Sequence, residues 1–284
     1  MKQYKVAIIG NGMICNAAHI PAYKAMGDKV KIVAVADIRE EAAKETAERH
    51  GIPKYYVDPY KMLEEEKPDI ISVCTPNAYH KEYTLAGFRV GCHVVCEKPV
   101  AVTCADAEEM FNAAEKAGKH LFVIQSLRFT GNFKAAAGLA KSGCLGDIYY
   151  ADLNLVRRRG VPRWGMFHMA KENVGGAFCD LGVHMCDYLM SISGNPKMVS
   201  VSGSAVTRIV NKEKNIEFSN AESGAPTGLF TPRKFDMKEF DVEEFANGYI
   251  RLENGMTVTF KISWALNLPN SNTVSICGDK GGLT

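Results

Sequence analysis

Short apolar runs alternate with longer helical segments through residues 1–125, and this alternation constrains the fold more than any other feature of the sequence. The runs are largely apolar from end to end, whereas a strand with one face in water alternates apolar and polar residues. They occupy residues 6–9, 32–36, 70–74, 93–96 and 121–124. Such strands, separated by helices, are typical of a parallel sheet covered on both faces. The sequence therefore predicts a domain of this kind over residues 1–125.

Residues 126–284 follow a different pattern, in which alternating strands lie between helical segments. A hairpin is indicated where Glu253-Asn254-Gly255 separates two alternating runs. We expect helices at 132–142 and 175–191, strands at 148–158, 199–210, 244–252 and 256–264, and a long loop over 211–241. The pattern predicts an α+β domain in which helices lie beside an antiparallel or mixed sheet.

Composition excludes several classes of protein. There are 34 Lys and Arg residues against 32 Asp and Glu, a net charge of +2, which does not suggest nucleic acid or an anionic membrane as the main partner. The nine cysteines include no C-x-x-C pair, so we expect reduced thiols in a cytoplasmic protein. The apolar run 6–9 is too short for a signal peptide. The longest uncharged stretch, 262–278, contains Pro269 and several asparagines, which argues against a membrane span.

A glycine-rich turn after the first predicted strand indicates a dinucleotide site. It reads Gly10-Asn11-Gly12-Met13-Ile14-Cys15 and opens a helix, which is the context in which this motif is informative. Gly10 permits a tight turn, and Gly12 lets the main chain approach a pyrophosphate at the helix N-terminus. Met13 and Ile14 are predicted to line the same turn. Cys15 stands where a third glycine is usual, and a small side chain still allows close packing.

Asp37 supports this interpretation, because it follows the second predicted strand. A carboxylate at that position can accept hydrogen bonds from the adenosine ribose, and Asp37 can also serve as a helix N-cap. Its charge repels a 2′-phosphate, so NAD is favoured, with NADP as the alternative. Arg39 can stack on the adenine or contact a phosphate.

Two further motifs make the interpretation specific. Glu97-Lys98-Pro99 ends one predicted strand, and Thr75-Pro76-Asn77 ends another, with His80 close behind. The segment 175–184, Gly-Gly-Ala-Phe-Cys-Asp-Leu-Gly-Val-His, is followed by Asp187. Together these motifs resemble the glucose–fructose oxidoreductase, inositol dehydrogenase and rhizopine-catabolism family, known as Gfo/Idh/MocA.

The resemblance implies an α/β protein with an N-terminal Rossmann parallel sheet and a C-terminal α+β domain built on a large open, mostly antiparallel sheet. It implies oxidation or reduction at a secondary alcohol of a sugar, glycoside or cyclitol. Lys98, Asp180 and His184 match the catalytic residues of the family. The cofactor is expected to contact Cys74, Thr75, Pro76, Asn77, His80, Glu97 and Lys98. Family members usually continue beyond the position of Thr284, so a short form or a further C-terminal segment is expected.

The chemistry of alcohol oxidation suggests a role for each residue of the catalytic set. The cofactor takes a hydride, so the protein must take the hydroxyl proton. Asp180, His184 and Asp187 are spaced to share one face of a helix. We expect His184 to be the base, with a nearby carboxylate favouring its imidazolium form, and Lys98 to polarise the alcohol. The alternative is that these two residues share the proton. Asp180 is expected to orient them or to bind the substrate. Asp187 is expected to be structural.

The substrate is predicted to be bound by a loop that combines donors with an aromatic face. Arg157 and Trp164 lie in this loop, and Arg128 is a further donor of the same kind. These groups suit the hydroxyls and ring of a sugar or cyclitol. An exposed, solvated loop is the alternative.

The sequence also bears on turnover, metal binding and oligomerisation. A sensor that binds NAD or a sugar without turnover is the alternative to an enzyme. A zinc site would need Cys179, Asp180, His184 and Cys186, but it lacks the usual ligand spacing, so no metal is predicted. The second sheet needs cover on both faces, so we expect a homodimer or homotetramer packed sheet to sheet.

Overall fold

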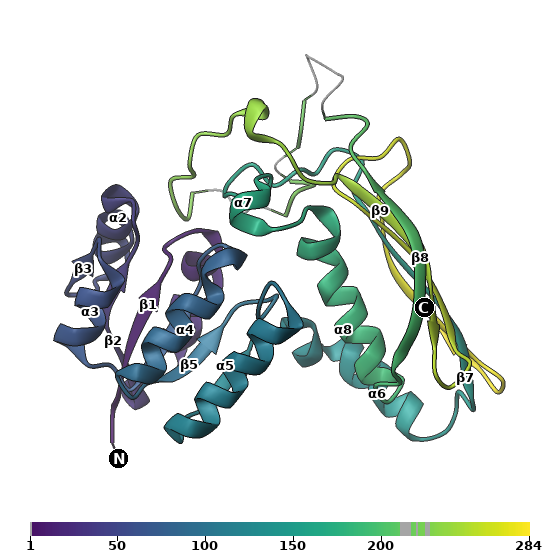
Figure 1. Cartoon of the computed structure of the whole chain (residues 1–284), viewed down its shortest axis with the longest axis horizontal. Helices are drawn as coiled ribbons and strands as arrows, with labels where there is room; N and C mark the ends of the chain where they lie inside the picture. The colour runs from purple at the N-terminus through teal and green to yellow at the C-terminus, as the bar shows by residue number, and fades with distance from the viewer. Residues whose placement is uncertain (1, 211–216, 220, 225–227) are drawn as a thin grey trace.

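The first sheet is parallel throughout and has the strand order β3-β2-β1-β4-β5-β6 (Figure 1). The structure is a computed structural model that describes residues 2–210, 217–219, 221–224 and 228–284. The strands are β1 (Tyr4–Ile9), β2 (Val30–Ala36), β3 (Tyr55–Tyr56), β4 (Ile70–Val73), β5 (His93–Cys96) and β6 (Leu121–Val123). The order reverses between β1 and β4. In sheets of this topology, ligands bind outside the carboxyl ends of the strands at that reversal.

Helices cover both faces of this sheet, which explains why its strands are largely apolar. Ala7 and Ile9 of β1 pack into one buried cluster, and Val6 and Ile8 pack into another on the opposite face. The helical segments are η1 (Cys15–His19), α1 (Ile20–Ala25), η2 (Gly27–Lys29), α2 (Glu40–His50), α3 (Pro59–Glu66), η3 (Asn77–Tyr79), α4 (His80–Arg89) and α5 (Cys104–Ala117). The predicted Rossmann architecture is therefore confirmed.

The second sheet is mixed and mostly antiparallel, with the order β12-β11-β7-β10-β9-β8. Only β7 and β10 pair in parallel among the described strands of this sheet. The strands are β7 (Ile148–Val156), β8 (Met198–Val206), β9 (Phe245–Leu252), β10 (Thr257–Ser263), β11 (Ser271–Gly278) and β12 (Gly282–Leu283). The helical segments of this half are η4 (Ser126–Phe129), α6 (Gly131–Lys141), α7 (Ala170–Asn173), η5 (Phe178–Gly182), α8 (Val183–Ile192) and η6 (Met237–Glu239). The fold class is as predicted.

The core of this half lies between the sheet and helices α6 and α8, which pack on one face (Figure 1). Trp264, Met256 and Ile262 are among its fully buried side chains. The other face carries polar and aromatic side chains such as Tyr249, which is 37% exposed. One face of the sheet is therefore covered by helices of this chain, and the other is left to solvent.

Several local predictions were wrong or incomplete. The predicted helix 175–191 starts later and begins with a π-helical turn, η5, before it continues as α8. Strand β11 and the short helices α3 and α7 were not predicted. Asp37 is not a helix N-cap, because α2 starts with Arg39 in the N-cap position. Part of the predicted loop 211–241 lies outside the described residues, and the rest contains η6.

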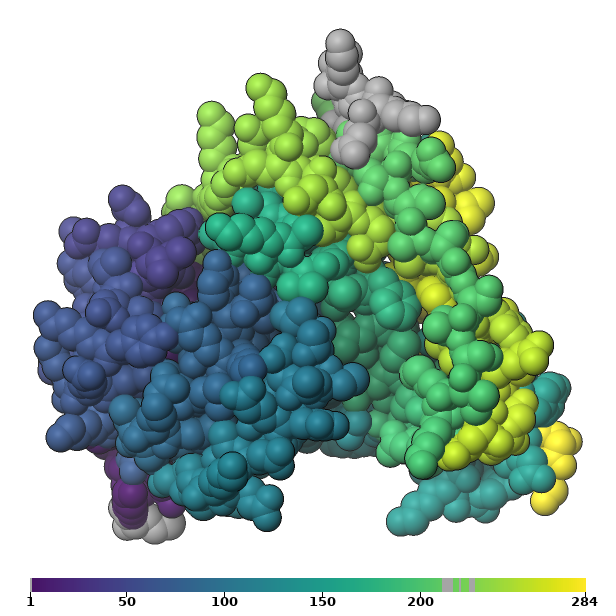
Figure 2. All heavy atoms as spheres, in the orientation of Figure 1, coloured from purple at the N-terminus to yellow at the C-terminus, as the bar shows by residue number. Residues whose placement is uncertain are grey.

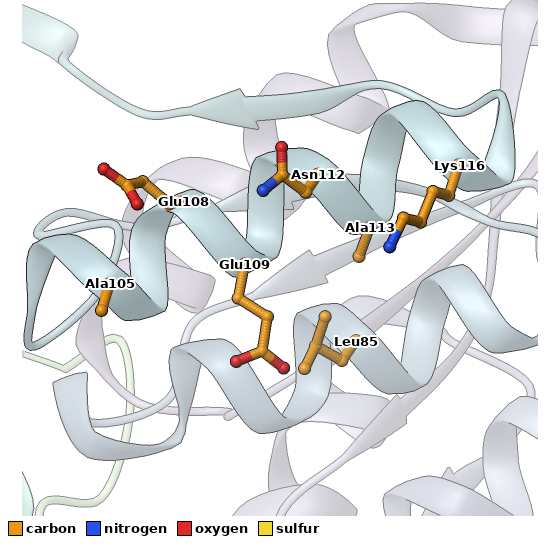
Figure 3. A pocket seen from close by; sticks show the side chains of 7 residues that line it. All are labelled: Leu85, Ala105, Glu108, Glu109, Asn112, Ala113 and Lys116. Carbon is orange, nitrogen blue, oxygen red and sulfur yellow. The ribbon is translucent and has the colours of Figure 1, made fainter.

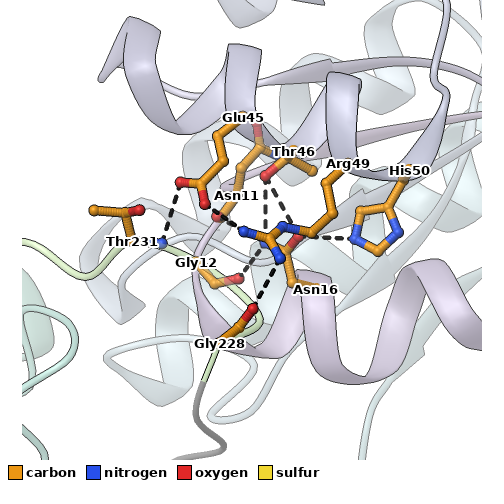
Figure 4. A network of polar contacts seen from close by, with 9 residues as sticks. All are labelled: Asn11, Gly12, Asn16, Glu45, Thr46, Arg49, His50, Gly228 and Thr231. Carbon is orange, nitrogen blue, oxygen red and sulfur yellow. Dashed lines mark hydrogen bonds and ion pairs between the residues drawn. The ribbon is translucent and has the colours of Figure 1, made fainter.

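The segment between β8 and β9 reaches from the second sheet to the first half, where its described residues lie against the purple and blue surface (Figure 2). There Arg49 donates to the carbonyl oxygen of Gly228 at 2.8 Å, and Thr231 N–H donates to Glu45 at 3.1 Å. Figure 4 shows these contacts around helix α2, beside the Gly12 turn. The two halves are thus tied together at the edge of the predicted cofactor site.

None of the helices in the described ranges is both long enough and apolar enough to span a bilayer.

Candidate active site

The Gly10 turn has the geometry that a dinucleotide site needs. Gly10 has a φ of +91°, and a Cβ there would lie 2.6 Å from the main-chain carbon and oxygen of Cys74, so no other residue fits without strain. A Cβ at Gly12 would meet no atom of the described chain within 4 Å. The open space at Gly12 is therefore available to a ligand. Asn16 Nδ2 donates to the carbonyl oxygens of Asn11 and Gly12 at 3.1 and 2.9 Å (Figure 4), which braces the turn from behind.

Cys15 fills the third position of the motif as a packing residue. Its side chain is fully buried between the helix and the strands. Burial raises the pKa of its thiol to about 12, so the side chain stays neutral at physiological pH. The departure from glycine is thus accommodated by close packing, as expected from a small side chain.

Two buried polar atoms near this turn make no hydrogen bond within the described part of the chain. Asn11 Oδ1 and Thr75 Oγ1 are inaccessible to solvent and have no hydrogen-bond partner among the described residues. Buried polar groups are almost always paired. Together with the space at Gly12, they fit a bound dinucleotide.

Asp37 lies where the adenosine ribose of a dinucleotide is expected. Its Oδ2 accepts from Asn11 N–H at 2.8 Å, and its Oδ1 accepts from Arg39 N–H at 2.9 Å. The Arg39 guanidinium lies 3.7 Å from the same carboxylate. The carboxylate is therefore fixed beside the glycine turn, although its contact with a ribose remains a prediction.

The segments that follow β4 and β5 are held together at their carboxyl ends. The ring nitrogens of His80 lie 2.7 Å from the Pro99 carbonyl oxygen and 3.0 Å from that of Thr75, so the ring joins the two segments. The peptide bond between Lys98 and Pro99 is cis. Asn77 Nδ2 donates to the carbonyl oxygen of Asn173 at 2.9 Å, so α7 of the second half contacts the predicted nicotinamide segment.

Lys98 and Asp180 form an ion pair between the two halves of the protein. Lys98 Nζ donates to Asp180 Oδ1 at 3.0 Å and to the Asp180 carbonyl oxygen at 2.9 Å. Their side chains are 15% and 11% exposed. Burial alone would raise the pKa of Asp180, but the charge and hydrogen bond of Lys98 outweigh it and lower the pKa. Asp180 is therefore an anion that holds Lys98 in place.

The second oxygen of Asp180 is held by a residue that sequence reasoning missed. Trp264 directly follows β10 and is completely buried. Its Nε1 donates a hydrogen bond of 3.1 Å to Asp180 Oδ2. No motif contains this tryptophan. Its rarity in the sequence, with only two present, was the one signal that could have drawn attention to it.

His184 is neutral at physiological pH, contrary to the predicted preference for imidazolium. Burial is the main cause, and the positive charge of Lys98 adds to it, so the pKa of His184 falls to about 4 despite the carboxylates nearby. Its Nδ1 is buried and has no hydrogen-bond partner within the described part of the chain. A neutral ring with a free nitrogen beside a lysine can accept a proton.

Each of the predicted substrate residues makes a different set of contacts within the protein. Arg128 forms a two-point ion pair with Asp187, at 2.5 and 2.8 Å, so the structural role expected for Asp187 is confirmed. Arg157 lies near Asp180, and its Nη1 donates to the Ser223 carbonyl oxygen at 3.0 Å. Trp164 stacks at a tilt against Phe167, and its indole nitrogen is buried without a partner among the residues described. Contact of any of them with a substrate remains a prediction.

Glu97 is more deeply engaged with the protein than expected of a cofactor ligand. Its Oε2 accepts from Lys98 N–H at 3.2 Å, and its Oε1 lies 2.9 Å from His19 Nε2. Neither His19 nor Asn173 lies in a motif that was predicted to form the site. Both act on site residues from distant parts of the chain.

Two other features of the structure do not belong to this site. The zinc alternative finds no support, since the described residues contain no group of three or more His, Cys, Asp or Glu side chains that could hold a metal. A surface pocket lies between α4 and α5 (Figure 3). Its lining residues are Leu85, Ala105, Glu108, Glu109, Asn112, Ala113 and Lys116, none of them a predicted site residue.

Comparison with known proteins places both halves in the same group. Residues 4–125 match the family model described as "Oxidoreductase family, NAD-binding Rossmann fold", and residues 133–284 match the GFO/IDH/MocA C-terminal domain. D-glucoside 3-dehydrogenase of Escherichia coli is 36% identical over 282 residues, which cover 99% of this chain and 76% of that protein. Myo-inositol 2-dehydrogenase of Thermotoga maritima is 30% identical over 190 residues, or 67% of this chain and 55% of that protein.

Solved structures of low sequence identity share the fold. GenD2 from gentamicin A biosynthesis, determined in complex with NAD, superposes with a TM-score of 0.81 at 22% identity, covering 99% of this chain and 72% of that one. The WlbA dehydrogenase of Chromobacterium violaceum, determined with NADH and UDP-GlcNAcA, gives 0.80 at 24% identity and covers 99% and 73%.

Proposed function

Because the chain belongs to the Gfo/Idh/MocA family of oxidoreductases with an NAD-binding Rossmann fold, we propose that it oxidises a secondary hydroxyl of a sugar, glycoside or cyclitol and that Lys98, Asp180 and His184 carry the reaction. The family resemblance predicted from the motifs is confirmed, as is NAD as the cofactor. The observation that supports these roles most strongly is the Lys98–Asp180 pair next to a neutral His184 with a free ring nitrogen.

Bound NAD would supply the hydride acceptor, so the residues of the protein have to take the hydroxyl proton and stabilise the charge on oxygen. A ring nitrogen of His184 accepts the hydroxyl proton, since a ring with a pKa of about 4 is unprotonated at neutral pH. Lys98 Nζ donates a hydrogen bond to the same oxygen and stabilises the charge that develops on it. Asp180, held by Trp264, keeps the Lys98 ammonium directed at that position.

The cofactor set is proposed to follow the strand ends. Gly10, Gly12, Met13 and Ile14 receive the pyrophosphate, and Asp37 with Arg39 receives the adenosine. The fixed charge of Asp37 favours NAD over NADP. Cys74, Thr75, Pro76, Asn77, His80, Glu97 and Lys98 lie along the nicotinamide half. The division at residues 125 and 126 separates this domain from the one that binds the substrate.

A glycoside is the first substrate to test, because D-glucoside 3-dehydrogenase is 36% identical to this chain and matches 99% of it. Arg128, Arg157 and Trp164 are proposed to contact its hydroxyls and ring. The inositol relative keeps cyclitols in the same class. A donor–aromatic combination binds either kind of ring.

A homodimer or homotetramer is proposed to form through the uncovered face of the second sheet. Tyr150, Asp152 and Thr259 form a hydrogen-bonded group there, with Thr259 Oγ1 donating to Asp152 at 2.6 Å and lying 2.8 Å from the Tyr150 hydroxyl. Because helices of this chain cover the opposite face of the sheet, a second copy packed against this face would complete its cover. Mass measurement in solution tests it, and a monomer at micromolar concentration would contradict it.

The catalytic proposal is tested by following NADH absorbance with purified protein, NAD and a panel of glycosides, free sugars and inositols. Reduction of NAD by one of them is expected. Dinucleotide binding without turnover of any would favour the sensor alternative.

A further inference from the structure

A buried chain of polar side chains runs behind the predicted nicotinamide segment. His19 Nε2 lies 2.9 Å from Glu97 Oε1, and His19 Nδ1 lies 3.2 Å from Ser72 Oγ. Ser72 Oγ in turn lies 2.7 Å from the Tyr23 hydroxyl. All four side chains are buried, and they come from η1, β4, α1 and the end of β5. Burying polar groups costs free energy unless they are paired, and each of these four side chains is paired with another of them.

One end of this chain reaches Lys98. Glu97 Oε1 is engaged with His19, and its Oε2 accepts from Lys98 N–H at 3.2 Å. Because both oxygens are engaged, the carboxylate has one orientation. Lys98 is thus held at two points: its main chain by Glu97 and its ammonium by Asp180.

The charge of Glu97 depends on the same contact. Burial alone would raise the pKa of Glu97, but the hydrogen bond and charge of His19, followed by the charge of Lys98, lower it below its usual value. The other titratable groups that sense this charge are His80, His184, Cys74 and Cys96. Burial lowers the pKa of the two histidines and raises that of the two thiols, so these groups are neutral at physiological pH.

We propose that His19 is a positioning residue of the dehydrogenase reaction: through Glu97 it fixes the main chain of Lys98 and keeps a carboxylate charge behind the Lys98 ammonium. The inference rests on the proposed function, because it assigns His19 to the reaction at Lys98. A catalytic group displaced by about 1 Å can lose a hundredfold in rate. His19 itself touches neither substrate nor cofactor in this role.

Three variants test the proposal by steady-state kinetics across pH. His19→Leu fills the space but removes the bond to Glu97, and we expect kcat to fall about tenfold to a hundredfold, with KM and NADH affinity changed less than about threefold. In the pH profile of kcat for His19→Leu, the fall in rate on the acid side moves to higher pH, because Glu97 is then protonated more easily. His19→Gln retains a donor and is expected to recover part of kcat. Glu97→Gln keeps the shape without the charge and is expected to lower kcat.

The matched control is His93→Gln. His93 begins the same strand, β5, at the end opposite Glu97, where its Nδ1 accepts from His120 N–H. We expect its kcat and pH profile to equal those of the parent. A folded His19→Leu variant with the parent's kcat and pH profile would overturn the proposal.

An infrared titration separates this proposal from the proposed function, because it needs no turnover. The band of the protonated Glu97 carboxyl is identified by its loss in Glu97→Gln. We expect the band to appear at higher pH in His19→Leu than in the parent. If His19→Leu does not fold, Ser72→Ala removes the partner of His19 Nδ1 and is expected to shift the band in the same direction by less. An unshifted band refutes the proposal even if the parent oxidises no sugar.

Discussion

Replacing Lys98 by methionine is expected to destabilise the protein in a way that depends on pH. The change removes the cation that pairs with Asp180. The carboxylate, 11% exposed, keeps the hydrogen bond from Trp264 Nε1 and the nearby charge of Arg157. Breaking a buried ion pair by removing one partner costs about 3–5 kcal/mol. Since this pair is not wholly buried, we expect about 3 kcal/mol at pH 7.

The pH dependence follows from the direction in which the pKa of Asp180 moves. In the parent that pKa is lowered, so Asp180 stabilises the fold above the pKa it has in the unfolded chain, and this stability is lost as the pH falls. Without Lys98 the pKa of Asp180 rises, because only Arg157 and Trp264 then oppose the effect of burial, and the carboxylate stabilises the fold less than in the parent. The difference between parent and variant is therefore largest at neutral pH and shrinks as the pH is lowered.

Denaturant unfolding at several pH values measures this difference directly. Lys44→Met is the control, because Lys44 pairs with Glu48 on the surface at 4.0 Å and is expected to cost under about 0.5 kcal/mol. A loss for Lys98→Met that is below about 1 kcal/mol at pH 7, or that is the same at about pH 3 as at pH 7, would refute the reasoning.

Three further changes give distinct expected results. Gly10→Ala puts a Cβ 2.6 Å from the main chain of Cys74 at a φ of +91°, and a strain of about 1–2 kcal/mol predicts roughly tenfold weaker NADH binding in a fluorescence titration; equal affinity would contradict the turn's role. Asp37→Ser removes the charge that repels a 2′-phosphate, so the ratio of kcat/KM for NADP to that for NAD rises; an unchanged ratio would remove Asp37 from the adenosine site. His184→Gln lowers kcat by about 10²–10⁴-fold and abolishes the fall in rate expected near pH 4, where His184 becomes protonated; a variant that keeps the limb would place the base elsewhere.

The strands and the helices of the first half were predictable because their signals are local. A run such as 70–74 is apolar except for Ser72, and the structure buries both of its faces. Strand β11, Ser-Asn-Thr-Val-Ser-Ile-Cys-Gly, carries only a few apolar residues and was missed. Its strand conformation depends on pairing with β7, which lies far away in the sequence. The π-helical turn at 178–182 has no sequence periodicity that distinguishes it from an α-helix.

The residues of the site likewise fall into two groups: those that lie in local motifs and those that reach the site from distant parts of the sequence. Gly10, Asp37 and Lys98 lie in motifs at strand ends, so their positions follow from short segments of sequence. Trp264 reaches Asp180 across 84 residues, and His19 reaches Glu97 across 78, so neither contact leaves a local pattern. The protonation state of His184 was misjudged for a related reason, because the burial that lowers its pKa arises only when the two halves are folded.

Hydride transfer from a deuterated substrate tests the central claim most directly. The protein is incubated with NAD and glycosides, sugars or inositols that are deuterated at their secondary carbons, and the nicotinamide is analysed by mass spectrometry. The proposed reaction yields deuterated NADH with at least one of them, and His184→Gln yields much less in the same time. If the protein binds NAD but none of the substrates transfers deuterium to it, the assignment of Lys98, Asp180 and His184 to sugar or cyclitol oxidation is contradicted.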